Sequence, residues 1–214
     1  KKGDFIGVVD GIGNFWEASI IDLHSIQLTS SFAKPLISEP QPKTLICLAV
    51  VLPKRGFDEV LRMCCEIGVD IFQPLSSERR VSKGNMAEKV SRWKAILRES
   101  LEQSERLWMP ELRTTIHFND WLNDNSPKSV KAIATTRLQK SVEFQTWLDK
   151  LDKGIKNVSL AVGPEGGWSD SEMEIALKDS CVGVTFSENI LRTSTASIAG
   201  SQLMVTWRRV ENLF

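Results

Sequence analysis

Two short runs rich in glycine and threonine follow strand-like segments in the C-terminal half of the chain, and they constrain the fold more than any other feature. Residues 163–167, Gly-Pro-Glu-Gly-Gly, come directly after the apolar segment 158–162. Residues 190–196, Ile-Leu-Arg-Thr-Ser-Thr-Ala, come after the β-rich segment 182–186 and lead into a mostly apolar helical stretch. Open α/β sheets usually place a ligand at the carboxyl ends of their strands. The sequence therefore predicts a ligand site between these two loops.

The first run is predicted to join a strand to a helix. Three glycines and one proline within five residues permit a backbone turn that side chains would block, which leaves main-chain groups free to contact a ligand. Ser169 is placed to cap the following helix, and Glu172 is placed to reach back to it.

Three interpretations of this glycine run are open from the residues alone. A Walker-type phosphate loop is disfavoured, because no Gly-Lys-Ser/Thr follows and Glu165 puts an acid where phosphate would bind. A purely structural turn is the second interpretation. The third is a site for a ligand that contains adenine, which needs backbone hydrogen-bond partners and an apolar slot, and Ile190 and Leu191 could provide that slot.

The pattern between the N-terminal segment and these loops predicts an α/β fold with a parallel sheet. Residues 44–51 form a continuous apolar run, as in a strand covered on both faces. Apolar residues then recur at helical spacing from Phe57 to Ile67, and Gly68 provides a stop before the next strand at 69–74. Strand, helix, strand order implies crossover helices. Further strands are expected at 130–135, 158–162 and 182–186, and helices at 87–105, around 142–151, at 171–178 and after Thr195.

Residues 1–40 are predicted to form a separate small β unit. Its expected strands are 5–9, 15–21 and 25–28, and the first two are joined by a glycine-containing hairpin. Three short strands bury little surface, so the unit must either lean on the rest of the chain or lack strands. Residues 35–42 contain three prolines and are predicted to be an extended linker at a domain boundary.

Composition restricts the class of protein and its partners. No apolar run approaches the roughly 18 to 20 residues of a membrane span, and no export signal is evident, so we expect a cytoplasmic protein without a membrane partner. Four cysteines without CxxC spacing and two histidines give poor support to a metal site, and Cys64 and Cys65 are expected to be buried, reduced thiols. The 27 basic and 27 acidic residues cancel, so any RNA contact must come from a local basic patch.

Residues 163–167, the following Ser-x-x-Glu and residues 190–193 resemble the bacterial 16S ribosomal RNA uracil-N3 methyltransferase family, within the SPOUT superfamily of knotted methyltransferases. Ser77-Glu78-Arg79, and Glu102-Gln103-Ser104 followed by Arg106, also resemble motifs of that family. The resemblance implies a SPOUT-type trefoil-knotted parallel sheet with flanking helices over residues 41–214, preceded by a partial PUA-like β-barrel over residues 1–40.

The resemblance also implies S-adenosylmethionine as the cofactor, bound by loops after three strands. The carried-over cofactor positions are Thr135, Thr136, Gly163, Pro164, Glu165, Gly166, Gly167, Ser187, Ile190, Leu191, Arg192, Thr193, Thr195 and Ala196. Methylation of uracil N3 requires loss of a weakly acidic imide proton, so a base or a cation that stabilises the anion would serve. Arg192 is predicted to be the cation. Glu165 is either the base or a residue that bonds neighbouring N–H groups.

The implied substrate is 16S ribosomal RNA or the small ribosomal subunit, and the implied assembly is a homodimer. Arg79, Arg80, Lys83 and Arg106 are predicted to bind RNA, within a segment where basic residues outnumber acidic ones. The chain departs from the family at four positions: Glu105 and Ser187 replace glycine, Asn189 replaces arginine and Ser194 replaces glutamate. These departures leave open methylation of another RNA position, or RNA binding without catalysis.

Overall fold

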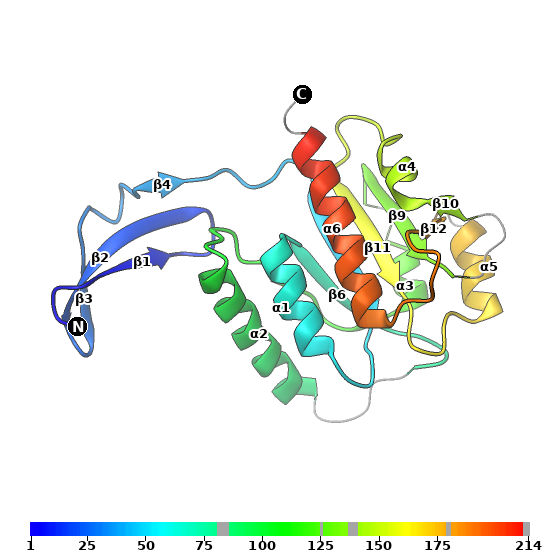
Figure 1. The fold of residues 1–214 in the computed structure, drawn as a ribbon, viewed down its shortest axis with the longest axis horizontal. Helices are drawn as coiled ribbons and strands as arrows, with labels where there is room; N and C mark the ends of the chain where they lie inside the picture. Colours follow the sequence, from blue (N-terminus) through cyan, green and yellow to red (C-terminus); the bar gives the residue numbers. More distant parts are fainter. Residues whose placement is uncertain (81–85, 125, 137–140, 179–180, 212–214) are drawn as a thin grey trace.

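The computed structural model describes residues 1–80, 86–124, 126–136, 141–178 and 181–211, and its chain forms a small antiparallel β unit beside a larger α/β unit (Figure 1). The larger unit holds a parallel sheet with helices on both faces. The α/β class predicted from the sequence is therefore confirmed.

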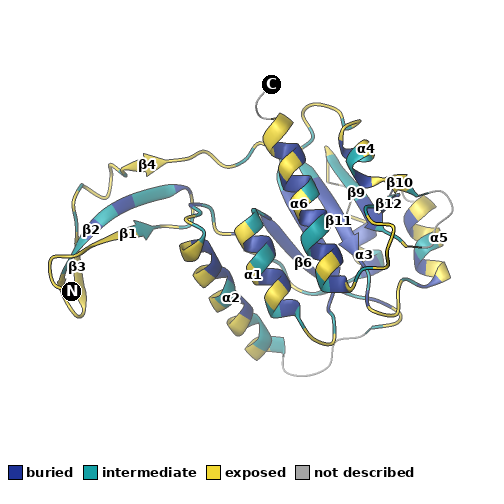
Figure 2. Cartoon of the chain, in the orientation of Figure 1, coloured by how far each residue is buried: buried dark blue, intermediate teal, exposed yellow. Residues whose placement is uncertain are grey.

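The small unit contains the three predicted strands and one more. β2 (Asn14–Asp22) pairs antiparallel with β1 (Phe5–Val9) on one side, and with β3 (Ser25–Leu28) and β4 (Ile37–Ser38) on the other. β4 lies in the proline-rich segment that the sequence predicts to be an unpaired linker. Much of this unit is exposed or half-buried (Figure 2), and many of its apolar side chains are exposed. Trp16, stacked on Phe32 at 4.9 Å, is one of its few buried residues.

Hydrogen bonds fasten the small unit to the larger one. The backbone N–H of Gly13 donates to the carbonyl of Leu107 (2.9 Å), and that of Met109 donates to the carbonyl of Gly11 (2.9 Å). The Trp108 indole donates to the carbonyl of Glu39 (3.0 Å). The β1–β2 hairpin is thus held by the segment that follows α2.

The large sheet has the strand order β10-β12-β9-β11-β5-β6-β7, with β8 also paired to β6, and all these pairs are parallel. Its strands are β5 (Leu45–Val51), β6 (Ile71–Ser76), β7 (Glu111–Leu112), β8 (Ile116–His117), β9 (Ser129–Ala134), β10 (Val142–Glu143), β11 (Asn157–Val162) and β12 (Val182–Thr185). The five predicted strands are confirmed, whereas the two-residue strands were not predicted. Such short edge strands leave too little pattern for a sequence prediction.

The helices form two layers. They are α1 (Phe57–Ile67), α2 (Met86–Gln103), α3 (Phe118–Leu122), α4 (Phe144–Leu148), α5 (Asp170–Lys178) and α6 (Thr193–Glu211). Helices α1, α2, α4 and α6 pack on one face of the sheet, and α3 and α5 pack on the other. The helix expected around 142–151 is shorter, because its first two residues pair with β12 instead.

Alternate residues of the central strands serve the two layers. On β5, Ile46, Leu48 and Val50 join the core under α1 and α6, whereas Ala49 and Val51 join the core under α3. This explains the uninterrupted apolar run in the sequence, since both faces are covered (Figure 2). Gly200 lets α6 lie against β11, because a Cβ there would come within 2.2 Å of the Leu160 side chain.

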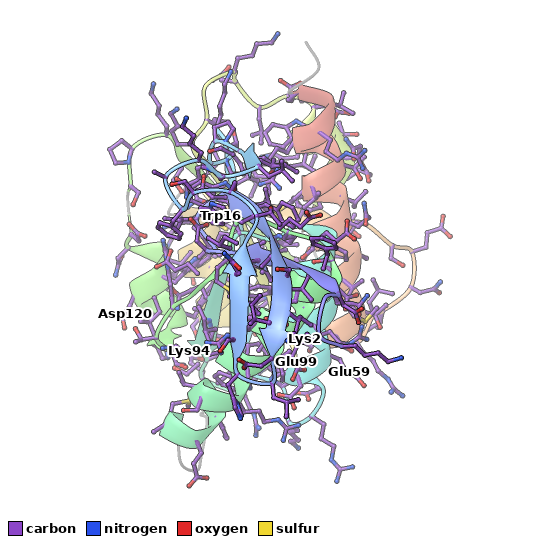
Figure 3. All side chains as sticks on the ribbon, turned by 90° about the vertical axis from the view of Figure 1, so that its left-hand side faces the viewer. Lys2, Trp16, Glu59, Lys94, Glu99 and Asp120 are labelled. Atoms are coloured by element: carbon purple, nitrogen blue, oxygen red, sulfur yellow. The ribbon has the colours of Figure 1, made fainter. Side chains whose placement is uncertain are left out.

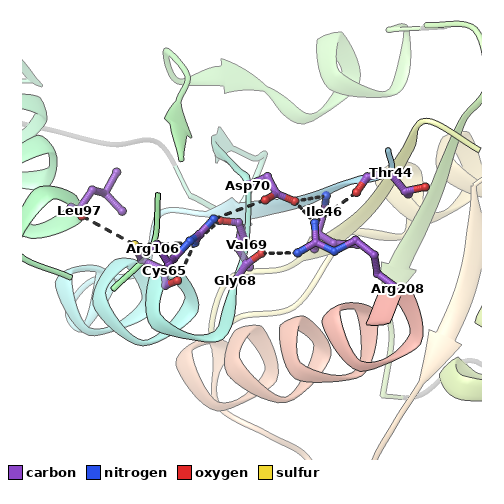
Figure 4. A network of polar contacts seen from close by, with 9 residues as sticks. All are labelled: Thr44, Ile46, Cys65, Gly68, Val69, Asp70, Leu97, Arg106 and Arg208. Carbon is purple, nitrogen blue, oxygen red and sulfur yellow. Dashed lines mark hydrogen bonds and ion pairs between the residues drawn. The ribbon is translucent and has the colours of Figure 1, made fainter. Parts of the chain in front are cut away.

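A buried ionic network joins four elements at the amino end of β5 (Figure 4). The carboxylate of Asp70, on the connection between α1 and β6, accepts from the N–H of Ile46 (2.8 Å) and pairs with Arg106 (3.4 Å) and with Arg208 of α6. The guanidinium groups also donate to carbonyl oxygens: Arg106 to those of Cys65 (2.6 Å) and Val69 (2.9 Å), and Arg208 to those of Gly68 (3.0 Å) and Thr44 (3.2 Å).

Glu105 has the left-handed backbone conformation that the family's glycine would favour, with φ at 56°. A side chain is strained there. Glu105→Gly is therefore expected to raise the free energy of unfolding by about 0.5–1 kcal/mol, measured by urea denaturation. As a control, Glu102→Gly within α2 should lower it by about 1 kcal/mol. A Glu105→Gly variant less stable than the native chain would contradict the claim that the backbone at Glu105 is strained.

Candidate functional site

Three loops follow neighbouring strands at the same edge of the sheet. Thr135 and Thr136 follow β9, residues 163–167 follow β11, and residues 186–192 connect β12 to α6. Because β12, β9 and β11 are adjacent and parallel, their carboxyl ends lie side by side (Figure 1). The predicted order of strand, glycine turn and helix is confirmed for β11 and α5.

Hydrogen bonds tie the glycine loop to the start of α6, and the loop after β9 to strand β12. The hydroxyl of Thr193, at the start of α6, donates to the carbonyl of Gly163 (2.9 Å). The N–H of Thr135 donates to the carbonyl of Val184 on β12 (2.9 Å). The structure therefore brings together Thr135, Gly163 and Thr193, residues separated by up to 58 positions in the sequence.

Trp168 fixes the glycine loop against the neighbouring strand. Its indole N–H donates to the carbonyl of Ala134 (3.2 Å), and its ring packs on Phe118 at 4.3 Å. A Cβ on Gly163 would come within 2.9 Å of the indole, so glycine is needed for this close approach. We did not predict Trp168 from the sequence. The only sequence signal for a role of Trp168 at the site is its position directly after the glycine run, and a large aromatic residue there is equally typical of the hydrophobic core.

Residues 190 and 191 present an unpaired backbone next to the glycine loop. Within the described residues, the N–H and C=O groups of Ile190 and Leu191 make no hydrogen bond. The Ile190 side chain is 67% exposed, while Leu191 packs against the core. Unpaired main-chain donors and acceptors beside apolar side chains are what an adenine ring requires, so these residues fit such a group.

The other predicted cofactor residues are divided between surface and core. Ser187 is exposed, and its hydroxyl accepts from the N–H of Asn189 (3.1 Å). Ser187 is not among the described residues with positive φ, so its backbone does not demand the glycine of the family. Gly166, Gly167 and Thr195 are exposed, whereas Pro164 and Ala196 are buried.

Arg192 lies at the beginning of α6, one residue before the contact with Gly163. Its carbonyl accepts the first helical bond from the N–H of Ala196 (2.8 Å). Its side chain is exposed, and within the described residues the guanidinium makes no hydrogen bond or ion pair. It is a cation at the junction of two loops that is available to a substrate.

Glu165 uses its carboxylate to hold the loop that follows β5. One oxygen accepts from the N–H of Lys54 (2.9 Å). Partial burial acts to raise the pKa of Glu165, but hydrogen bonds from the N–H groups of Lys54 and of Glu165 itself, with the charges of Arg80 and Lys54, outweigh it and lower the pKa. A lowered pKa makes a weaker base. The contact favours the second alternative for this residue, bonding of neighbouring N–H groups.

The predicted capping box is present at the start of α5. The Ser169 hydroxyl accepts from the N–H of Glu172 (3.0 Å), and the Glu172 carboxylate accepts from the N–H of Ser169 (2.9 Å). The other carboxylate oxygen of Glu172, which is fully buried, accepts from the N–H of Glu78 (2.9 Å). Glu78 in turn accepts from the hydroxyl of Ser171 (2.9 Å). The cap thus also ties the glycine loop to the turn after β6.

Glu172→Ala would leave two backbone N–H groups without their acceptor. We expect a loss of about 2–3 kcal/mol in the free energy of unfolding, measured by chemical denaturation. Glu174→Ala is the matched control on the same helix, because Glu174 forms an exposed pair with Lys178 and should change stability by less than about 0.5 kcal/mol. Equal effects of the two substitutions would contradict the role assigned to Glu172.

Comparison with known proteins identifies the family. A family model described as an RNA methyltransferase domain matches residues 39–205. The chain belongs to this family. The ribosomal RNA small subunit methyltransferase E of Synechocystis is 34% identical over 199 residues, which cover 92% of this chain and 64% of the relative. The chain therefore spans slightly less than two thirds of that relative's length.

Two solved structures share the fold of this RNA methyltransferase domain. One is the ribosomal RNA small subunit methyltransferase E from Neisseria gonorrhoeae bound to S-adenosyl methionine, with 25% identity and a TM-score of 0.80, covering 96% of this chain and 84% of that one. The other is a Legionella pneumophila methyltransferase in complex with the cofactor SAM, with 25% identity and a TM-score of 0.81, covering 95% of this chain and 83% of that one.

The basic residues predicted to bind RNA differ in how exposed they are and in which groups they bond within this RNA methyltransferase domain. Arg79 is exposed and donates to the carbonyl of Gly166 (2.7 Å), and Arg80 donates through Nε to the carbonyl of Leu52 (3.2 Å). Lys83 lies outside the described residues. Arg106 differs from the other predicted RNA-binding residues: its side chain is 15% exposed and is bonded within the Asp70 network. Arg106 therefore stabilises the fold.

The cysteines are buried, as expected from the sequence. All four cysteines are buried and free, and burial raises the pKa of Cys64 to about 12. Among the described residues, no group of three or more His, Cys, Asp or Glu side chains could hold a metal ion. No helix in the described part of the chain is long and apolar enough to cross a membrane.

Proposed function

We propose that this RNA methyltransferase domain uses S-adenosylmethionine to methylate N3 of a uridine in 16S ribosomal RNA of the small subunit. The observation that supports this most is the meeting of three loops at Gly163, Thr193 and Ala134, beside the unpaired backbone of Ile190 and Leu191. The names of the Synechocystis and Neisseria relatives, and the cofactor in the Neisseria structure, support the substrate and the cofactor.

The residues suit the cofactor chemically. The exposed glycine backbone at 166–167 and the main chain of Ile190 and Leu191 would hold its adenosine part, and Thr135 and Thr136 would complete the third wall. When bound, S-adenosylmethionine supplies an electrophilic methyl group.

Arg192 would stabilise the uracil anion that forms as the N3 proton passes to solvent water. N3 would then bond to the methyl group, and the electron pair of the broken S–CH3 bond would remain on the cofactor sulfur. The negative charge that develops at N3 spreads onto the two flanking carbonyl oxygens of the ring. A guanidinium is always charged and presents several donors in a fixed plane, so it can hold either these oxygens or a phosphate. We assign to Glu165 the role of holding the loop that contains Lys54, because its carboxylate accepts from the N–H of Lys54 and its pKa is lowered.

The finer architecture belongs to the same proposal. We infer a trefoil knot within residues 41–214, a PUA-like β unit in residues 1–40, a homodimer and a cytoplasmic location. The parallel sheet with helices on both faces and the fold shared with the solved relatives, at TM-scores of 0.80 and 0.81, agree with such a domain, and the knot itself is inferred from the family resemblance.

Calorimetry with S-adenosylmethionine tests the cofactor, and transfer of a labelled methyl group to small-subunit RNA tests the reaction. We expect heat of binding at one site per chain and label in the RNA. Absence of both would indicate an RNA-binding protein that has kept the fold without catalysis. Heat without label would leave the cofactor site intact and contradict the proposed substrate.

A further inference from the structure

The loop between β5 and α1 carries two cations that the sequence alone does not assign to a site. Lys54 and Arg55 are both exposed. Within the described residues, neither side chain makes a hydrogen bond or an ion pair. The charge of Lys54 also acts on Glu165, but a long cationic side chain that is held in no hydrogen bond or ion pair can still reach an anion.

The backbone of this loop is nevertheless fixed. Glu165 accepts from the N–H of Lys54 (2.9 Å), and the carbonyl of Leu52 accepts from Arg80 (3.2 Å). The N–H of Leu52 donates to the carbonyl of Leu75 (3.1 Å). The loop is thus bonded to the glycine loop on one side and to the β6 strand and turn on the other. Because the backbone that carries Lys54 and Arg55 is already ordered, less conformational entropy is lost when these side chains bind an anion.

Four exposed cations lie on segments that each contact the glycine loop. Lys54 and Arg55 are on the segment held by Glu165, Arg79 bonds the carbonyl of Gly166 (2.7 Å), and Arg192 adjoins the bond from Thr193 to Gly163. We call Lys54, Arg55, Arg79 and Arg192 the cationic rim. Adjacent strands are about 4.8 Å apart, so loops after β11, β5 and β6 extend over about 10 Å.

Several acidic residues lie near the rim. Glu165 is bonded to the backbone N–H of Lys54, Glu78 accepts from the hydroxyl of Ser171, and Asp58 pairs with Arg92. Asp170 and Glu188 are exposed on the same segments, and a Glu59 oxygen lies 3.7 Å from the Cβ position of Gly56. Lys54 and Arg55 make no hydrogen bond or ion pair with any of these carboxylates within the described residues, so both cations can still contact an anion.

A groove elsewhere on the surface is lined by more acidic than basic residues. A groove of about 480 Å³ between α1 and α2 is lined by Asp58, Glu59, Glu66 and Glu99 against Arg62 and Arg92. Glu59 and Glu99 are labelled in Figure 3, which views the molecule from the side of the small β unit. Arg92 there pairs with Asp58. Such a groove would repel a phosphate backbone, so the basic surplus of the α2 sequence does not make this face an RNA site.

We propose that Lys54 and Arg55 bind phosphates of the RNA beside the target nucleotide, with Arg79 continuing the contact. This inference rests on the proposed function. An ammonium or guanidinium on an exposed loop neutralises phosphates without reading bases, so it contributes affinity and position on the strand. The rim then offers a local site for a polyanion on a chain with no net charge, because its exposed cations lie beside the proposed cofactor site.

The test compares Lys54→Ala/Arg55→Ala with Lys150→Ala/Lys153→Ala, in which two exposed lysines are removed from the segment that leads into the amino end of β11. Affinity for small-subunit RNA is measured at several salt concentrations, together with methyl transfer and calorimetry with S-adenosylmethionine. We expect the rim variant to bind RNA about tenfold more weakly and to reduce the salt slope by about 1 to 2. Cofactor affinity should be unchanged, and the control variant should match the native chain.

The outcomes separate this inference from the proposed function. Equal RNA affinity and equal salt slope in the two double variants would overturn the role of Lys54 and Arg55, even if methyl transfer is observed. If the native chain transfers no methyl group but the rim variant still binds RNA more weakly than it does, the role of Lys54 and Arg55 would be supported and the proposed function overturned. Reduced cofactor affinity in the rim variant would also overturn the inference, because it would show that these residues support the cofactor loop.

Discussion

Arg192→Ala is expected to lower methyl transfer by about 100-fold or more while S-adenosylmethionine still binds. The guanidinium is exposed and makes no bond within the described residues, so its removal leaves the hydrogen bond from Thr193 to Gly163 intact. The variant should therefore fold and keep its cofactor loops, but lack the charge that stabilises the deprotonated uracil. Single-turnover transfer of a labelled methyl group measures the rate, and calorimetry measures the cofactor.

Two further variants sharpen this test. Arg209→Ala removes an exposed arginine near the other end of the same helix and should behave as the native chain. Arg192→Lys keeps the charge but not the planar donors, so an intermediate rate is expected if the arginine holds the two uracil oxygens. Near-normal turnover in Arg192→Ala would remove this residue from the mechanism.

Asp70→Ala is expected to destabilise the fold strongly, with a loss of about 3–5 kcal/mol in the free energy of unfolding. The carboxylate is buried, and it is the shared acidic partner of Arg106 and Arg208, so its removal leaves two largely buried guanidinium groups without a counter-charge. For a chain of this size the melting temperature should fall by about 10 °C. Thermal and urea denaturation measure the effect.

The control for Asp70 is Glu66→Ala, which removes a half-exposed pair with Arg62 in the neighbouring helix. That pair should contribute less than about 1 kcal/mol. A loss below about 1 kcal/mol in Asp70→Ala would contradict the role of the network, and would reopen the question of what holds Arg106 inside the fold.

The strands and long helices were predictable because the spacing of apolar residues along the chain reflects which side chains are buried. The run at 44–51 is apolar throughout since β5 is covered on both faces, and Phe57 to Ile67 are spaced as α1 requires. The capping box of Ser169 and Glu172 was predictable for the same reason, because its partners are three residues apart.

What could not be predicted depends on contacts between distant residues. Arg106 looks like a surface cation in the sequence, and only its packing beside Asp70 shows that it is internal. The second partner of Glu172 is 94 residues away, and the partner of Glu165 is 111 residues away. The glycine run indicated where a ligand could bind, whereas the folded chain shows which loops approach it.

Methyl transfer from labelled S-adenosylmethionine to small ribosomal subunits that lack the modification, followed by mapping of the labelled base, tests the central claim most directly. The account predicts label at N3 of one uridine in 16S ribosomal RNA, and its loss in Arg192→Ala but not in Arg209→Ala. Label found only in transfer RNA, or at a different atom of the ribosomal RNA, would contradict it.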